Sequence, residues 1–191
     1  MIDFFVSLPT WMLIRVFGMS AYIVLFLGMA LGILYSYPQW KGARKAQMLR
    51  WHKFANITGT GLALLHTVLL IIDTFMPFDW AELVLPFSAK HNPILNGIGT
   101  LALYGLLLVL FTTDIRNMLK RKVWLAFHFL SYPIYILCVC HGFLLGSDSK
   151  LGWVSFMYGA TVLILIVLTA ARFLMVPRKR QLKSVHVSKQ L

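Results

Sequence analysis

The sequence predicts an all-α polytopic membrane protein with about five transmembrane helices in one bundle. Of its 191 residues, 59% are hydrophobic and only 13% are charged, and the mean hydropathy is +0.77. Soluble domains are about half apolar and about a quarter charged, so this composition excludes them. The apolar residues also fall into runs that are long enough to cross a bilayer and that are separated by charged segments.

Each apolar run is interpreted as one membrane span. The runs cover about residues 11–36, 52–77, 93–113, 123–145 and 153–176. The first ten residues have neither a basic region nor a small-residue cleavage site, so no removable signal peptide is expected. We therefore predict one transmembrane domain over residues 1–176 and a short basic cytoplasmic tail over residues 177–191.

The charged residues predict the orientation of the bundle in the cell membrane. Fifteen of the 18 Lys and Arg residues lie at the same ends of the spans: Lys41, Arg44, Lys45, Arg50, Lys53, Arg116, Lys120, Arg121, Lys122, Arg172, Arg178, Lys179, Arg180, Lys183 and Lys189. Because basic loops stay in the cytoplasm, the N-terminus is expected outside and the C-terminus inside. This topology, with anionic lipid headgroups, accounts for the net charge of +12 without nucleic-acid binding.

Four histidines lie within the predicted spans. His52 and His66 are fourteen residues apart in the second span, and His128 and His141 are thirteen apart in the fourth. Both spans run from the cytoplasm outward, so each pair is separated by roughly 20 Å along its helix. Imidazole at this depth is costly unless it is bound or paired, and it is an axial ligand of haem iron. We therefore predict a haem-binding bundle with two b-type haems, one above the other, each with two histidine ligands.

Helical phase supports this prediction for one helix and opposes it for the other. A spacing of fourteen residues leaves two side chains about 40° apart around the helix axis, so His52 and His66 lie on nearly the same face. A spacing of thirteen residues leaves two side chains about 140° apart around the helix axis, so His128 and His141 lie on different faces of a straight helix. Pro133 lies between these two and can kink the helix and free a carbonyl, which would change the direction in which His141 points.

A simpler explanation exists for each histidine taken alone. A single imidazole in a membrane helix can bond a backbone carbonyl of a neighbouring helix. Four histidines matched in depth on two helices favour the haem interpretation instead. His91, in an outer loop, and His186, in the basic tail, are interpreted as solvated surface residues.

These features resemble the ferric reductase-like transmembrane domain, the superfamily of ferric reductases, NADPH oxidases and the membrane haem subunit of the periplasmic methionine sulfoxide reductase system. The resemblance rests on the two histidine spacings, on the "HG" at His141 and on "IRVFGMSAY" in the first span. It implies two stacked haems that carry electrons from the cytoplasmic to the outer side. His52 with His128 would bind the inner haem iron, and His66 with His141 the outer one.

The resemblance stops at the transmembrane part. NADPH oxidases continue into a cytoplasmic flavin and nicotinamide domain, whereas only fifteen residues follow Val176 here, without a G-x-G-x-x-G motif. We expect no FAD or NADPH site in this chain, so that it would be one component of an oxidoreductase. The donor would be a cytoplasmic flavoprotein reductase or a membrane quinol. The acceptor would be extracytoplasmic: ferric iron, oxygen or a partner redox enzyme.

Other residues fit this interpretation without requiring it. Arg15 lies inside the first span, where its guanidinium would pair with propionates of the outer haem or reach lipid phosphates. Gly59, Gly61, Gly97 and Gly99 allow close approach of a porphyrin or of another helix. The outer loop over residues 77–93 is long enough to lie over the upper haem as a lid.

Two alternatives to this function remain open from the sequence. The first is a quinol-oxidising cytochrome b-like subunit of a larger complex. The second is a haem-free transporter or assembly partner that uses its histidines for protons or metal. The visible spectrum of the purified protein separates these classes.

Overall fold

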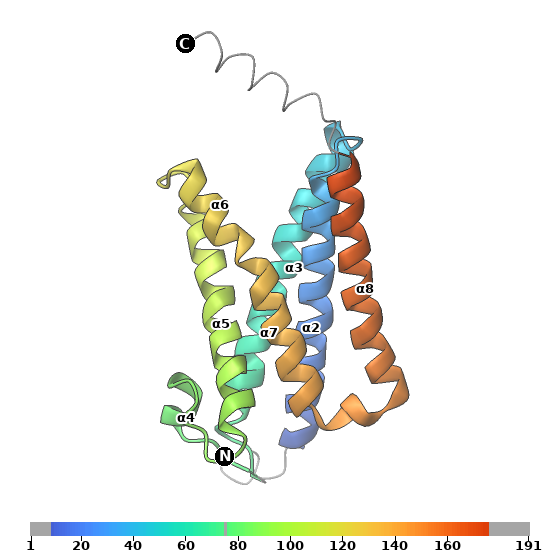
Figure 1. Cartoon of the computed structure of the whole chain (residues 1–191). Coiled ribbons are helices and arrows are strands. Elements are labelled where there is room, and N and C mark those ends of the chain that lie inside the picture. Colours follow the sequence, from blue (N-terminus) through green and yellow to red (C-terminus); the bar gives the residue numbers. More distant parts are fainter. Residues whose placement is uncertain (1–8, 75, 176–191) are drawn as a thin grey trace.

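The computed structural model describes residues 9–74 and 76–175, and within these ranges it contains helices and no strand (Figure 1). The predicted basic tail and its His186 lie outside the described residues. The elements are α2 (Thr10–Tyr35), α3 (Gly42–Leu69), α4 (Trp80–Val84), α5 (Pro93–Asp114), α6 (Arg121–Phe129), α7 (Ser131–Leu145), the 3-10 helix η1 (Ser147–Lys150) and α8 (Gly152–Met175). The prediction of an all-α polytopic membrane fold is confirmed.

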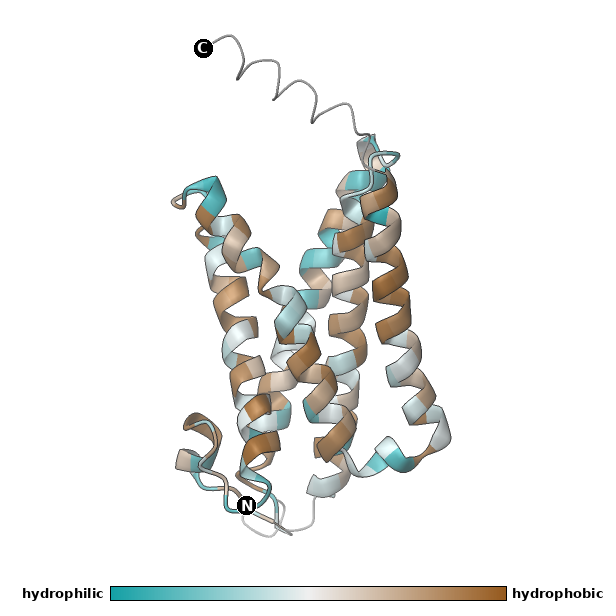
Figure 2. Cartoon of the chain, viewed as in Figure 1, coloured by the Kyte–Doolittle hydropathy of each residue, from teal (hydrophilic) through white to brown (hydrophobic). Residues whose placement is uncertain are grey.

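The long helices form one bundle. α2 packs along α3, α5 packs against α7, and α8 lies against α2 (Figure 1). Hydrophilic residues gather at the two ends of the bundle, and mainly hydrophobic residues lie between them (Figure 2). We call one end the basic end, defined by Lys41, Arg44, Lys45, Arg50, Lys53, Arg116, Lys120, Arg121, Lys122 and Arg172. The other is the acidic end, defined by Asp73, Asp79, Glu82 and Asp148.

Four helical segments among the described residues are long and apolar enough to cross a membrane. These are α2, α5, α6 continued by α7, and α8. The predicted second span exists as α3, which has 28 residues and packs along α2, but its composition is not apolar enough to be counted with the others. Its polar residues, which include Asn56 and the two histidines, lower its hydropathy. Each of the five predicted spans therefore corresponds to a helical segment of the bundle, with α6 and α7 counted together. Four of these five segments are apolar enough to cross a membrane by composition.

The helix of the predicted fourth span is interrupted where the sequence has Pro133. α6 ends at Phe129 and α7 begins at Ser131. Proline has no N–H to bond the carbonyl of Phe129, and the amide of Leu130 bonds the carbonyl of Phe127, three residues back, at 3.1 Å. This local tightening changes the phase of α7 relative to α6.

The core of the bundle contains a small polar network. The hydroxyl of Tyr22 on α2 lies 2.9 Å from that of Tyr135 on α7 and 2.5 Å from that of Thr161 on α8. All three residues are buried. Buried hydroxyls are costly unless they are hydrogen-bonded, so this network specifies how the three helices meet.

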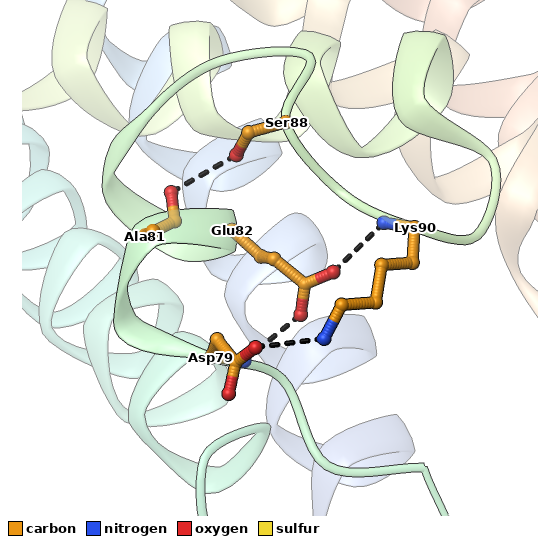
Figure 3. Close-up of polar contacts among 5 residues, drawn as sticks. All are labelled: Asp79, Ala81, Glu82, Ser88 and Lys90. Carbon is orange, nitrogen blue, oxygen red and sulfur yellow. Dashed lines mark hydrogen bonds and ion pairs between the residues drawn. The ribbon is translucent and has the colours of Figure 1, made fainter.

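The loop between α3 and α5 lies beside α5 at the acidic end and contains α4 (Figure 1). The Glu82 carboxylate accepts hydrogen bonds from the backbone amides of Asp79, at 2.9 Å, and Lys90, at 2.8 Å (Figure 3). The Lys90 ammonium donates to Asp79 at 2.7 Å. The Tyr104 hydroxyl donates to the carbonyl of Val84, which ties the loop to α5. These contacts hold the loop together and tie it to α5 at this end of the bundle.

Candidate functional site

The structure brings the four span histidines together as two pairs. The rings of His52 on α3 and His128 on α6 have centroids 6.2 Å apart and planes 72° apart. The rings of His66 on α3 and His141 on α7 have centroids 6.4 Å apart and planes 80° apart. We call these the basic-end pair and the acidic-end pair. His91 belongs to neither pair and is exposed in the loop before α5.

The position of His141 follows from the interruption of the helix at Leu130. On a continuous straight helix, thirteen residues would leave His141 about 140° from His128. With α6 and α7 as separate segments, both histidines meet partners on the same helix α3. The helix is therefore interrupted at Leu130, three residues before Pro133, and the two histidines on either side of the interruption both face α3.

Backbone carbonyls of neighbouring helices orient three of the four rings. Nδ1 of His52 lies 2.7 Å from the carbonyl oxygen of Gly28, and Nδ1 of His66 lies 2.8 Å from that of Ile14. Nδ1 of His141 lies 2.8 Å from the carbonyl oxygen of Leu95. A carbonyl oxygen only accepts hydrogen bonds, so each Nδ1 carries the proton and each Nε2 keeps its lone pair. This is the tautomer that binds a metal through Nε2.

Asn56 adds a second contact to His52. Its side-chain amide donates to the carbonyl oxygen of His52 at 2.7 Å and lies 3.2 Å from Nδ1 of the same residue. Because that Nδ1 donates to Gly28 over the shorter distance, it has no lone pair left for the amide. Asn56 therefore contacts the backbone of α3 beside His52, and the carbonyl of Gly28 sets the tautomer of the His52 ring.

His128 differs from the other three histidines. Its Nδ1 is buried and has no hydrogen-bond partner within the described part of the chain. Its ring stacks on Trp124, with centroids 5.2 Å apart and planes 24° apart. Packing against an indole, rather than a hydrogen bond, holds this ring.

The spacing of the pairs suits one metal ion between two imidazoles. Metal-bound imidazole nitrogens lie about 2 Å from the metal and about 1 Å from their own ring centroid, so two such rings have centroids about 6 Å apart. Both pairs have this separation. No group of three or more His, Cys, Asp or Glu side chains among the described residues is arranged to hold a metal ion. Each pair therefore has room for one metal ion between two imidazole nitrogens.

Arg15 has a partner that the sequence did not suggest. Its guanidinium makes a two-pronged ion pair with the carboxylate of Asp148 in η1, with Nε 2.7 Å from Oδ2. The pair lies at the acidic end, and Ile14, the residue before Arg15, supplies the carbonyl for His66. Arg15 therefore contributes to the site by joining α2 to the segment after α7.

Sequence reasoning missed several contacts of the site. Three histidines bond backbone carbonyls, and every residue has a carbonyl, so residue type does not indicate which one is the partner. Trp124 is four residues before His128, a spacing that places two side chains on one helix face, so a stacking partner was detectable in principle. The hydroxyl of Tyr135, between the two histidines of the predicted fourth span, bonds that of Tyr22 on α2.

Comparison with known proteins gives one match. The family model described as the ferric reductase like transmembrane component matches residues 17–139, which is more than half of the chain. No curated protein and no solved structure matches the chain. The matched region contains His52, His66 and His128, and His141 follows two residues after its end.

Proposed function

Because the chain belongs to the ferric reductase-like transmembrane family, we propose that it is a transmembrane electron-transfer subunit with two b-type haems. His52 and His128 would bind the iron of one haem, and His66 and His141 the iron of the other. The observation that carries the proposal is the presence of two histidine pairs whose ring centroids are 6.2 and 6.4 Å apart. A porphyrin supplies four nitrogens to its iron, so two histidines complete the ligand set.

The chemistry of each centre follows from its ligands. A haem with two axial histidines is a one-electron carrier and keeps no position open for oxygen. The chain's own residues present Nε2 of each histidine, and in three of the four cases they hold the Nδ1 proton on a carbonyl. Such hydrogen bonds orient a ligand and raise its basicity.

The same proposal accounts for the low hydropathy of α3. Its two histidines would be costly in lipid, but they lie against His128 and His141 and would bind iron there. We propose that α3 crosses the membrane with the four apolar segments. The basic end would face the cytoplasm by the positive-inside rule, which makes the basic-end pair the inner site.

The donor and the acceptor lie at opposite ends in this proposal. A cytoplasmic flavoprotein reductase or a membrane quinol would reduce the inner centre. An extracytoplasmic acceptor, such as ferric iron, oxygen or a partner redox enzyme, would take electrons at the acidic end. The loop around Glu82 lies at that end and would border the path of the acceptor.

We also propose that Arg15 serves the outer centre. Two of its five N–H groups reach Asp148, and those that remain can donate to a propionate. Arg15→Gln should then shift the spectrum or midpoint potential of the outer centre. Asp148→Asn, which removes the ion pair but keeps the guanidinium, should leave that centre closer to wild type. Equal shifts in the two variants would assign Arg15 to the ion pair alone.

The test of the proposed function is the haem content of the purified chain. Pyridine haemochrome analysis of protein made under haem-replete conditions should give about two b haems per chain. His91→Ala is the matched control and should keep both. A value near one would leave one histidine pair as ligands, and zero would contradict the proposal and favour a haem-free transporter or assembly partner.

A further inference from the structure

We propose that Gly18, Gly32 and Gly99 are positioning residues for three of the four histidine ligands. Each glycine exposes the backbone carbonyl one helical turn before it, and that carbonyl accepts the Nδ1 proton of a histidine from another helix. The haem side of this inference rests on the function proposed above. The hydrogen bonds and the glycine contacts are observed directly.

The three cases repeat one arrangement. The carbonyl that binds His66 belongs to Ile14, four residues before Gly18. The carbonyl that binds His52 belongs to Gly28, four residues before Gly32.

The third case lies on a different helix. The carbonyl that binds His141 belongs to Leu95 of α5, four residues before Gly99. The arrangement therefore does not depend on features of α2 alone.

A side chain at any of these glycines would collide with the imidazole. A Cβ atom would lie 2.9 Å from Nδ1 of His66 at Gly18 and 2.8 Å from Nδ1 of His52 at Gly32. At Gly99 it would lie 2.6 Å from Nδ1 of His141. These distances are too short for real contacts, so an alanine would displace each ring.

Helix geometry explains why glycine is needed four residues after the acceptor. Every Cα–Cβ bond in an α-helix is tilted toward the N-terminus, so a side chain covers the turn before its own Cα. The side chain at position i+4 therefore lies over the carbonyl of residue i. Without that side chain, the carbonyl can accept a hydrogen bond from another helix.

The spacing on α2 matches the spacing on α3. Gly18 and Gly32 are fourteen residues apart, as are His52 and His66, and the two helices run in opposite directions. Two packed helices with the same repeat bring both histidines into the same relation to α2. The agreement indicates that the two contacts have one structural cause.

The arrangement is absent at His128, whose Nδ1 has no hydrogen-bond partner within residues 9–74 and 76–175. The basic-end pair therefore has one oriented ligand, and the acidic-end pair has two. The bond from His52 to the carbonyl of Gly28 is the one carbonyl contact of this pair among the described residues, and an alanine at position 32 would displace it. We expect Gly32→Ala to affect haem retention more strongly than either single substitution at the acidic-end pair.

The test compares alanine substitutions at the three glycines with two control glycines. Gly152 and Gly159, both on α8, have no atom of the described residues within 4 Å of the position that a Cβ would take, so Gly152→Ala and Gly159→Ala should keep both haems. Gly18→Ala and Gly99→Ala should each convert the acidic-end centre from low-spin to high-spin or empty it, with the other centre retained. Gly32→Ala should do the same to the basic-end centre. Electron paramagnetic resonance and haem content per chain are the readouts.

Each outcome decides between specific explanations. Alanine is a better helix former than glycine, so intrinsic helix propensity cannot explain a loss of haem. Haem-replete variants with wild-type spectra would overturn the inference and leave the proposed function intact. If all three variants failed to fold while both controls folded, the glycines would serve helix packing, and the inference would again be wrong. A wild-type chain without haem would contradict the proposed function and this inference together.

Discussion

The imidazole planes of His66 and His141 are 80° apart, with ring centroids 6.4 Å apart. Nδ1 of each ring is held by a carbonyl of a different helix, Ile14 on α2 and Leu95 on α5. Neither ring can rotate about an axis through its Nε2 without losing that hydrogen bond. The relative orientation of the two ligands is therefore set by the helix packing.

This near-perpendicular arrangement predicts a spectroscopic signature. Axial imidazoles at right angles interact with different d orbitals of the iron, which brings those orbitals close in energy. The ferric acidic-end centre should therefore give a strongly anisotropic low-spin signal, with its largest g value above that of centres with parallel ligand planes. Electron paramagnetic resonance of the oxidised chain measures this directly, and a signal typical of parallel planes would contradict the observed ring geometry.

Substitution of single histidines should separate the two centres. His52→Ala and His128→Ala should remove the same haem, because their rings form one pair, and His66→Ala and His141→Ala should remove the other. Redox titration followed by absorbance should show one component lost in each group. Loss of both haems from the folded double variant His52→Ala with His128→Ala would refute the division into two independent sites.

Tyr22 should contribute to stability through its two hydrogen bonds. Tyr22→Phe removes the contacts of its hydroxyl with the buried hydroxyls of Tyr135 and Thr161 and should cost about 1–3 kcal/mol of unfolding free energy. Tyr104→Phe is the matched control, because its hydroxyl lies on an exposed residue and its loss should cost about 1 kcal/mol or less. Unfolding in detergent, followed by circular dichroism, compares the two; equal effects would argue against the polar core network.

The loop at the acidic end should loosen in acid. The backbone amides of Asp79 and Lys90 donate to the Glu82 carboxylate and hold its pKa below the ordinary value. A lowered carboxyl pKa stabilises the folded loop above the ordinary glutamate pKa, and that stability is lost as pH falls through the lower value. Hydrogen exchange of residues 79–90 should therefore accelerate over this range.

Glu82→Gln is the control for this loop. The neutral side chain cannot gain or lose a proton, and its amide nitrogen cannot accept from a backbone N–H. The variant should exchange faster than wild type at neutral pH and change less in acid. A loop that exchanged equally in both proteins would rule out Glu82 as its anchor.

The salt dependence of the rate of haem reduction distinguishes the possible electron donors. A polypeptide of these 191 residues should not be reduced by NADPH alone, whereas dithionite should reduce it at once. The basic end presents a positive surface to an acidic flavoprotein, so reduction through such a partner should slow as salt rises. Reduction by a lipid-soluble quinol should depend little on salt. Rapid reduction by NADPH alone would contradict the expectation of a separate donor.

The sequence by itself determined the features that depend on local chain geometry. Apolar runs predicted the long helices. The fixed rise per residue predicted that His52 lies at the same membrane depth as His128, and His66 at the same depth as His141. Pro133 predicted an interruption, which the structure contains at Leu130. These predictions succeed because rise, phase and the missing proline amide are properties of one helix alone.

Only the tertiary structure decided which groups the side chains meet. It pairs Arg15 with Asp148, gives carbonyl partners to three histidines, and leaves Nδ1 of His128 without one among the described residues. It also shows that α3, the helix of the predicted second span, packs along α2 in the bundle. Such contacts depend on the rotation and crossing of packed helices. The carbonyl that binds a histidine belongs to another helix, where a glycine exposes it. The sequence around the histidine therefore gives no indication of it.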